Sequence, residues 1–329
     1  MDQHELLSQL PASVHDSFLD ITDYRVLGAS KHIHLIGCIL SGTASDFERA
    51  GRSFEEFKAL ADQTGQFFQE TRGDASRAVY NAVGELLQMI HSLPVMEHYA
   101  EAVQTLVQQY DAHCRKNQCF IAECAAELSS DMQQILVYDY SSTVAMFLRQ
   151  LGTHEHKPQI LIPESRVING GAEFVLTAQQ CGLPVHFIPD AALLYYLPGC
   201  SAAFIGAETF FPDGTAFNTT GSDLAALACK LLSIPFYVLT PLNKVDFRAV
   251  FGHRKKAVMR NLQGTLSPCL KKNTDQTLVD FSCPELLPIP SGQITAYITE
   301  KGILPIPALF TAAREYADSL EVRNETMEP

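Results

Sequence analysis

The sequence has no tryptophan, no long hydrophobic run and too few basic residues to balance its acidic ones. With 24 Lys and Arg against 37 Asp and Glu, its net charge is −13. General nucleic-acid binding and docking on an anionic membrane both need a basic surface, so we expect neither partner. The longest uncharged run, residues 191–207, is interrupted by Pro198 and Gly199. It is also shorter than the roughly 20 residues that a membrane-spanning helix needs.

Paired cysteines and the common cofactor and metal motifs are missing as well. The nine cysteines include no CxxC pair, which is typical of reduced thiols in a cytosolic protein. Cys114, Cys119 and Cys124 recur every five residues, and on a helix this spacing turns each by about 140° from the last, so they cannot share a metal ion. GxGxxG, GxxxxGK[ST], HExxH and GxSxG are all absent. We predict no cofactor and no metal. The first residues, MDQHELLSQL, lack the basic and apolar regions of a secretory signal, which favours a cytoplasmic location.

The residues that are present divide the chain into two predicted domains. The first, residues 1–130, reads as helical because it contains long stretches with few helix breakers. Val79, Val83, Leu86, Leu87 and Ile90 recur at three- and four-residue spacing, which indicates an amphipathic helix. The predicted helices cover residues 26–40, 53–71, 72–93 and 95–128.

The second predicted domain, residues 131–329, alternates short apolar runs with helical stretches. The runs lack polar alternation, which is typical of strands buried on both faces of a parallel sheet. Their separation of about 20–30 residues fits successive βα units. The sequence therefore predicts a doubly wound, mostly parallel α/β domain, with a less regular excursion over residues 247–290. The predicted strands cover residues 134–138, 159–163, 184–188, 202–206, 235–239 and 295–299.

An acidic residue lies at or just after the end of five of these six strands. In order along the chain these residues are Asp139, Glu164, Asp190, Glu208 and Glu300. Because ligands of open α/β sheets bind outside the carboxyl ends of the strands, the acids predict a pocket suited to hydroxyl groups, to a cation or to acid–base chemistry. The alternative is that they cap the helices that follow, where Asp and Glu are favoured in any case.

Two further segments carry polar groups in a pattern. Residues 218–222, Asn-Thr-Thr-Gly-Ser, precede a predicted helix, and Asn218, Thr219, Gly221 and Ser222 could present donors to an anion there. Ordinary helix capping explains the same residues. A basic run stands out in this acidic chain, and we interpret it as a solvated helix face, with a patch for an acidic partner as the alternative. It comprises Arg248, His253, Arg254, Lys255, Lys256 and Arg260.

Several of these segments, taken in order, resemble one protein superfamily. They are ILVYDYSSTV, LIPESRVINGG, the stretch from GLPVHFIPD to LTPLNK, and ITAYITEKGILPIPAL. The superfamily contains the alpha, beta and delta subunits of eukaryotic translation initiation factor 2B, methylthioribose-1-phosphate isomerase and ribose-1,5-bisphosphate isomerase. The resemblance implies a helical N-terminal domain, a Rossmann-like C-terminal domain and a homodimer or larger assembly built through the latter.

The resemblance also implies roles for individual residues. In the isomerases a Cys and an Asp move protons on an opened phosphosugar, and their positions here are Asp139 and Glu208. Phosphosugar contacts are implied for Arg72, Arg166, Asn218 and Lys244. Leu27, Gly170 and Thr219 stand where the family has Arg, Gln and Lys, and each such replacement removes a side chain that the family uses to hold the phosphosugar.

Two functions remain open from the sequence. The replaced catalytic pair favours a non-catalytic regulatory or scaffold protein that resembles the initiation-factor branch and can bind a sugar phosphate or nucleotide. The alternative is an aldose–ketose isomerase in which Asp139 and Glu208 form a carboxylate acid–base pair.

Overall fold

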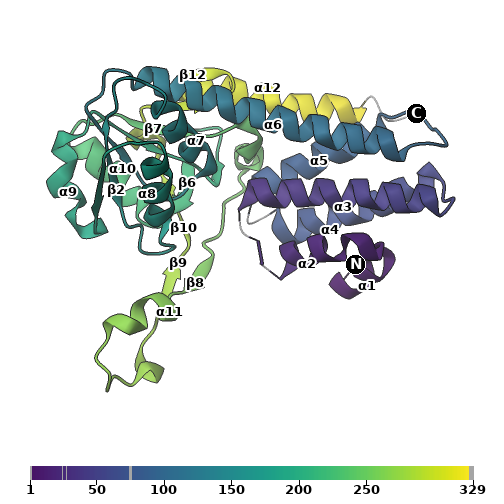
Figure 1. Ribbon diagram of the computed structural model, residues 1–329, viewed down its shortest axis with the longest axis horizontal. Coiled ribbons are helices and arrows are strands. Elements are labelled where there is room, and N and C mark those ends of the chain that lie inside the picture. The colour runs from purple at the N-terminus through teal and green to yellow at the C-terminus, as the bar shows by residue number, and fades with distance from the viewer. Residues whose placement is uncertain (1, 24, 27, 74–75, 326–329) are drawn as a thin grey trace. The chain divides into compact units, whose positions relative to one another are not determined.

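The computed structural model describes residues 2–23, 25–26, 28–73 and 76–325, and the chain divides into two compact units (Figure 1). The helical unit comprises Met1–Lys116, Asn243–Val245 and Arg314–Pro329. The sheet unit comprises Asn117–Leu242 and Asp246–Ala313. Two long helices, α6 (Ala100–Leu128) and α12 (Ile306–Glu325), contribute residues to both.

The helical unit is built from amphipathic helices around an aromatic core. Its remaining helices are α1 (Gln3–Gln9), α2 (His15–Thr22), α3 (Ala29–Arg49), α4 (Phe54–Arg72) and α5 (Arg77–His91). A capping box of Ser53 and Glu56 fixes the start of α4. The predicted stripe on α5 is confirmed, because Val79, Val83 and Leu86 are at most 1% exposed. No helix among the described residues is long and apolar enough to cross a membrane.

The sheet unit contains a seven-stranded sheet in the order β12-β11-β7-β4-β1-β2-β3. All neighbouring strands are parallel except the edge pair β11 and β12. This confirms the predicted α/β fold with a mostly parallel sheet. The strands are β1 (Gln134–Val137), β2 (Gln159–Pro163), β3 (Val185–Ile188), β4 (Ala202–Ile205), β7 (Phe236–Leu239), β11 (Ala296–Thr299) and β12 (Gly302–Pro305).

The sheet has a topological switch point between β1 and β4. From β1 the chain proceeds outward to β2 and β3, then returns to the other side of β1 with β4 and β7. Helices α7 (Ser142–Leu151) and α8 (Gly170–Gln180) pack against each other, and α10 (Ser222–Leu231) packs against β7. The short helix α9 (Leu193–Tyr196) precedes β4. The order of strands therefore reverses where β1 and β4 pair, which is where open α/β sheets bind ligands.

Two small antiparallel sheets complete this unit. One pairs β5 (Thr209–Phe210), β6 (Ala216–Thr219) and β10 (Leu286–Ile289). The other is a hairpin of β8 (Met259–Asn261) and β9 (Ser282–Pro284), with the short helix α11 (Gln263–Leu266) between its strands. Figure 1 shows this hairpin extending away from the rest of the sheet unit. It forms most of the predicted excursion over residues 247–290.

The prediction of a helix face for the basic run is wrong. Arg248 lies in a single 3-10 turn, Phe247–Phe251, and Gly252 ends this turn with a positive φ of 87°. Residues 253–258 belong to neither helix nor strand, and Arg260 lies in β8. Of the six basic residues, only Arg260 lies in the strand that pairs with β9, and the others lie in the 3-10 turn or in residues 253–258, so they share no helical face.

Candidate functional site

The two predicted catalytic residues follow the two strands at the switch point. Asp139 lies two residues after β1, and Glu208 lies three residues after β4. These strands are paired in parallel, with Val137 opposite Phe204. Both acids therefore lie at the carboxyl edge of the sheet, and the charge of Glu208 raises the pKa of the Asp139 carboxyl.

Asp139 is the more unusual of the pair. It is only 3% exposed, and its Oδ1 accepts a hydrogen bond from Ser165 Oγ at 3.2 Å. Burial raises the pKa of the carboxyl from 3.8 to about 6, although hydrogen bonds from Thr219, Ser165 and the Tyr140 backbone oppose that rise. A carboxyl with a pKa near 6 can release and regain a proton close to neutral pH.

Backbone strain is concentrated around this carboxyl. Asp139, Ser165 and Asn169 all have positive φ values, of 57°, 50° and 55°. A Cβ on Gly170 would lie 2.7 Å from Asp139 Oδ1, so only glycine allows the start of α8 to approach so closely. Conformations of this kind cost energy and cluster at functional sites.

A second network holds the strand ends beside Asp139. Asp190 accepts hydrogen bonds from the backbone N–H groups of Ser165 and Arg166, both at 2.9 Å. Tyr138 is 2% exposed, and its hydroxyl hydrogen-bonds to Asp190. Burial, followed by the charge of Asp190, raises the pKa of Tyr138 far above its ordinary range. The sequence did not predict Tyr138 and Ser165 as hydrogen-bonding residues of the site. Tyr138 belongs to an apolar run and Ser165 is a loop serine, and neither pattern differs from that of residues outside a site.

Two of the five predicted acids, Glu164 and Glu300, follow strands away from the switch point and bond to nearby protein groups. Glu300 accepts the Leu242 N–H with both carboxylate oxygens at 3.1 Å. Glu164 forms an ion pair with Arg166 at 3.3 Å. These two, like Asp190, contact loop residues at the sheet edge, and the contacts are not caps of the helices that follow, which was the predicted alternative. The group at the switch point is therefore Asp139 and Glu208.

The predicted anion-binding loop lies against the same edge. Gly221, with a φ of 107°, precedes α10, and a Cβ there would lie 2.1 Å from Tyr138 Oη. Asn218 and Ser222 are buried and hydrogen-bonded to each other, with 3.1 Å between Nδ2 and Oγ. The Gly221 N–H donates to Asp223 Oδ1 at 2.9 Å. The loop's donors therefore already bond to the protein, and a carboxylate occupies the first turn of the helix.

The predicted cationic contacts are dispersed. The Arg166 side chain is 46% exposed and pairs with Glu164. Arg72 belongs to the helical unit, where Nη2 donates to the carbonyls of Ile21 and Thr22 at 2.6 and 3.0 Å. Lys244 also belongs to the helical unit. Leu27 lies outside the described residues.

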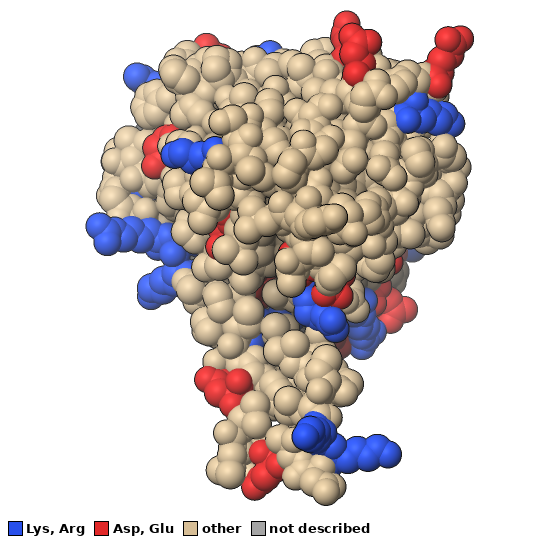
Figure 2. Space-filling model, turned by 90° about the vertical axis from the view of Figure 1, so that its left-hand side faces the viewer, with Lys and Arg blue, Asp and Glu red and all other residues tan. Residues whose placement is uncertain are grey.

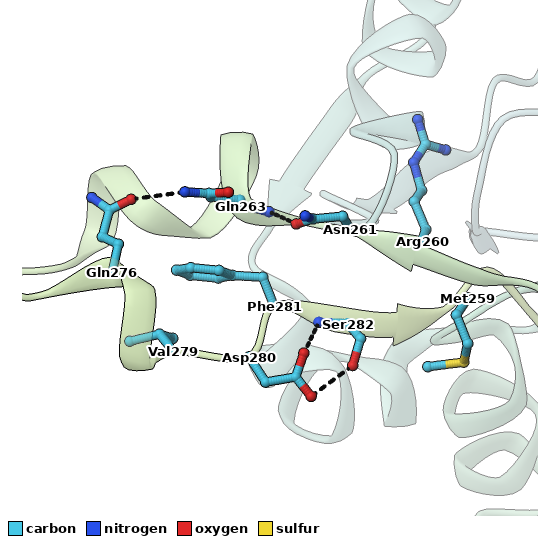
Figure 3. A pocket seen from close by; sticks show the side chains of 9 residues that line it. All are labelled: Met259, Arg260, Asn261, Gln263, Gln276, Val279, Asp280, Phe281 and Ser282. Carbon is cyan, nitrogen blue, oxygen red and sulfur yellow. Dashed lines mark hydrogen bonds between the residues drawn. The ribbon is translucent and has the colours of Figure 1, made fainter.

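A separate hollow of about 330 Å³ lies on the hairpin, and none of the predicted site residues lines it (Figure 3). Its polar groups pair with one another: Gln263 donates to Gln276, and Asp280 accepts from Ser282. Arg260 points away from the other lining side chains. We therefore do not assign this hollow as the ligand site. Among the described residues, no group of three or more His, Cys, Asp and Glu is arranged to hold a metal ion.

Comparison with known proteins shows which family the sequence matches. The model of the initiation factor 2 subunit family matches residues 42–306. A translation initiation factor eIF-2B subunit 2-like protein of Pyrococcus horikoshii is 30% identical over 118 residues, which cover 36% of this chain and 43% of that protein. A ribose 1,5-bisphosphate isomerase of Haloferax volcanii is 23% identical over 266 residues, which cover 79% of this chain and 80% of that enzyme.

Solved structures show the same fold. The P. horikoshii translation initiation factor eIF-2B matches with a TM-score of 0.72 and 20% identity, over 91% of this chain and 98% of that chain. A chain of the tetrameric eIF2B-beta2-delta2 complex from C. thermophilum matches with a TM-score of 0.65 and 14% identity, over 96% of this chain and 100% of that chain.

Proposed function

Because the chain belongs to the initiation factor 2 subunit family, we propose that it is a non-catalytic regulatory protein. In this proposal a phosphorylated small molecule, a sugar phosphate or a nucleotide, binds at the carboxyl edge of the sheet near the switch point. The observation that carries the proposal is the state of Asp139, whose buried carboxyl accepts hydrogen bonds from protein donors. A carboxylate engaged in this way has less freedom to take a substrate proton.

The support for binding comes from an exposed cation and not from the loop at residues 218–222. In that loop Asn218 and Ser222 bond to each other, and Asp223 accepts the Gly221 N–H. Arg166 is the exposed cation at this edge, and only the ion pair with Glu164 has to open for it to meet a phosphate. Hydrogen bonds to charged groups contribute about 1.5–3 kcal/mol each, so one such contact supports moderate affinity.

Isothermal titration of the full chain tests this function. The probes are ribose 1,5-bisphosphate, methylthioribose 1-phosphate and AMP. We expect saturable binding of at least one probe, weakened by roughly tenfold or more in Arg166→Gln because a charge-assisted contact is lost. Arg254→Gln is the matched control, since Arg254 is equally exposed but lies outside the sheet edge. Absence of binding by all three probes, or equal binding by Arg166→Gln, contradicts the proposal.

The isomerase reading stays as a second candidate because of the pKa of Asp139. A value of about 6, raised by burial and by Glu208, suits a group that exchanges protons near neutral pH. In that reaction one carboxylate removes a proton from the opened sugar and the other returns one at the neighbouring position. Asp139→Asn then abolishes ketose formation while the circular dichroism spectrum stays that of the wild type. If the wild-type chain forms no ketose, this candidate is excluded.

We also propose that the chain forms a homodimer through its sheet unit. Leu224, Leu227 and Leu231 recur along one side of α10 and are 63%, 52% and 74% exposed. Figure 2 shows the side of the molecule on which α9 and α10 are labelled in Figure 1, and a broad area there carries no charged side chain. An exposed apolar stripe of this kind is typical of an association surface. That a relative is a tetrameric complex supports the proposal.

Sedimentation equilibrium tests the dimer. The chain has a mass of 36.3 kDa, and we expect the wild type to sediment at twice that mass. Leu227→Asp should sediment as a monomer, whereas Val95→Asp, at an exposed apolar position in the helical unit, should remain dimeric. A monomeric wild type contradicts the proposal, and so does a dimeric Leu227→Asp.

Nine free cysteines in the structure support a reducing, cytoplasmic location for this dimer.

A further inference from the structure

Three side chains on the helical unit form a chain of contacts that none of the functions above uses. His34 and Cys38 lie one turn apart on α3, and Asp111 lies on α6. Cys38 Sγ lies 3.6 Å from His34 Nε2. On the other side of the ring, His34 Nδ1 lies 2.7 Å from Asp111 Oδ2.

The packing of the two helices builds this arrangement. A Cβ on Gly37 would lie 2.7 Å from Val107 Cγ1, so the glycine lets α6 approach α3 closely. Asp111 lies one turn beyond Val107, on the same side of α6. The close approach therefore brings the carboxylate to the imidazole, while the four-residue spacing on α3 places the thiol at the other ring nitrogen.

The hydrogen bonds determine which ring nitrogen carries the proton. An ionised carboxylate only accepts, so Nδ1 must be the donor to Asp111. In the neutral ring Nε2 is then unprotonated and faces the thiol of Cys38. This order of nucleophile, base and orienting carboxylate is the arrangement that activates a nucleophile in acyl-transfer enzymes. Because Sγ and the carboxylate lie at different ring nitrogens, they do not converge on one point as metal ligands would.

We propose that Cys38 is a modification site, a thiol that reacts with small-molecule disulfides with His34 as its general base and Asp111 as a positioning residue. His34 takes the proton from Sγ. The thiolate then attacks one sulfur of the disulfide, a new S–S bond joins it to Cys38, and the old S–S bond breaks. The departing thiolate takes the proton back from His34 and leaves as a thiol. Cys38 is oxidised to a mixed disulfide, and the other half of the disulfide is reduced.

The surroundings of the other thiols predict selectivity. Cys200 and Cys229 are buried, and burial raises their pKa to about 11 and about 12. Cys38 is half-buried and within reach of solvent. Burial, followed by the charge of Asp111, raises its pKa as well. Cys38 is therefore mainly a neutral thiol near pH 7, and its reaction depends on proton transfer to His34 rather than on a thiolate formed in advance.

The test is the rate at which glutathione disulfide modifies each cysteine of the intact chain, followed by peptide mass spectrometry. We expect Cys38 to react first of the nine. His34→Ala should slow its reaction by roughly a hundredfold, the usual contribution of a general base. His98→Ala, at a more exposed histidine of the same unit, is the control and should leave the rate unchanged. If Cys38 reacts no faster than the exposed Cys269 or the half-buried Cys114 and Cys119, or if His34→Ala keeps the wild-type rate, the proposal is wrong.

The role of Asp111 has its own readout. Nitrogen-15 NMR of the wild-type chain, at a pH high enough to observe the neutral form of the His34 ring, should show a protonated Nδ1 and an unprotonated Nε2. Asp111→Ala should give a mixture of the two tautomers together with slower modification of Cys38, and Asp111→Glu should restore part of both. A single unchanged tautomer in Asp111→Ala contradicts a positioning role.

Discussion

Replacing Asp139 by asparagine should stabilise the protein at neutral pH and leave its stability unchanged in acid. Asparagine has nearly the same shape as the aspartate, its amide oxygen can still accept from Ser165 Oγ, and it cannot ionise. It also tolerates the positive φ of 57° at this position better than other side chains do. The substitution therefore removes the buried charge with little other change.

The pKa of Asp139 determines how large this stabilisation is. A rise from 3.8 to about 6 is 6 − 3.8, or about 2.2 pKa units, and each unit corresponds to about 1.4 kcal/mol. The folded state therefore holds this proton more tightly than the unfolded chain, by about 3 kcal/mol. Between pH 4 and 6 the folded state binds more protons than the unfolded state, so this group's contribution to stability is full below pH 4 and is lost as the pH rises through about 6.

Urea unfolding at pH values from 4 to 8, for the wild type and Asp139→Asn, measures this directly. We expect the two free energies of unfolding to agree near pH 4. At pH 8 the variant should be more stable by up to about 3 kcal/mol, with the difference growing mainly between pH 4 and 6. Curves that run parallel across this range would refute the buried, proton-binding state of Asp139.

Two further substitutions test the packing around the site and in the helical unit. Gly221→Ala places a Cβ 2.1 Å from Tyr138 Oη at a φ of 107°. It should therefore lower the free energy of unfolding by about 1–3 kcal/mol. A urea midpoint equal to that of the wild type would contradict this close approach. Leu86→Ala empties a position that is 1% exposed and should cost about 2–5 kcal/mol. A melting temperature within error of the wild type in calorimetry would show that the α5 stripe does not form the core.

The central strands of the main sheet could be predicted from the sequence because they are buried on both faces, whereas the edge strand β12, whose residues are half-buried or exposed, was not predicted. The runs at 134–138, 159–163 and 202–206 are continuous apolar segments, and they form β1, β2 and β4. The strands of the small sheet carry no such signal. β5 has two residues, and β6 reads Ala-Phe-Asn-Thr, which is as typical of a loop as of a strand. It is a strand because it pairs with β5 and with β10, which lies about 70 residues further along the chain.

The site could be predicted only in part. That Asp139 and Glu208 reach one edge of the sheet follows from strand polarity alone. The partners of each acid depend on loop conformations that local pattern does not encode. Ser165 reaches Asp139 because its φ is 50°, and Asp190 holds that loop through two backbone N–H groups. The same limit applies to the basic run, where a 3-10 turn, an irregular segment and the start of β8 stand in place of the predicted helix.

The central claim is that this family member binds a phosphorylated small molecule without transforming it. Proton NMR of ribose 1,5-bisphosphate and methylthioribose 1-phosphate, each incubated with the wild-type chain, tests it most directly, with the double variant Asp139→Asn, Glu208→Gln as the reference. We expect that neither sugar gives a ketose signal above the double variant, while at least one sugar shows line broadening from binding. Ketose that accumulates with the wild type and not with the double variant would show that the chain is an isomerase.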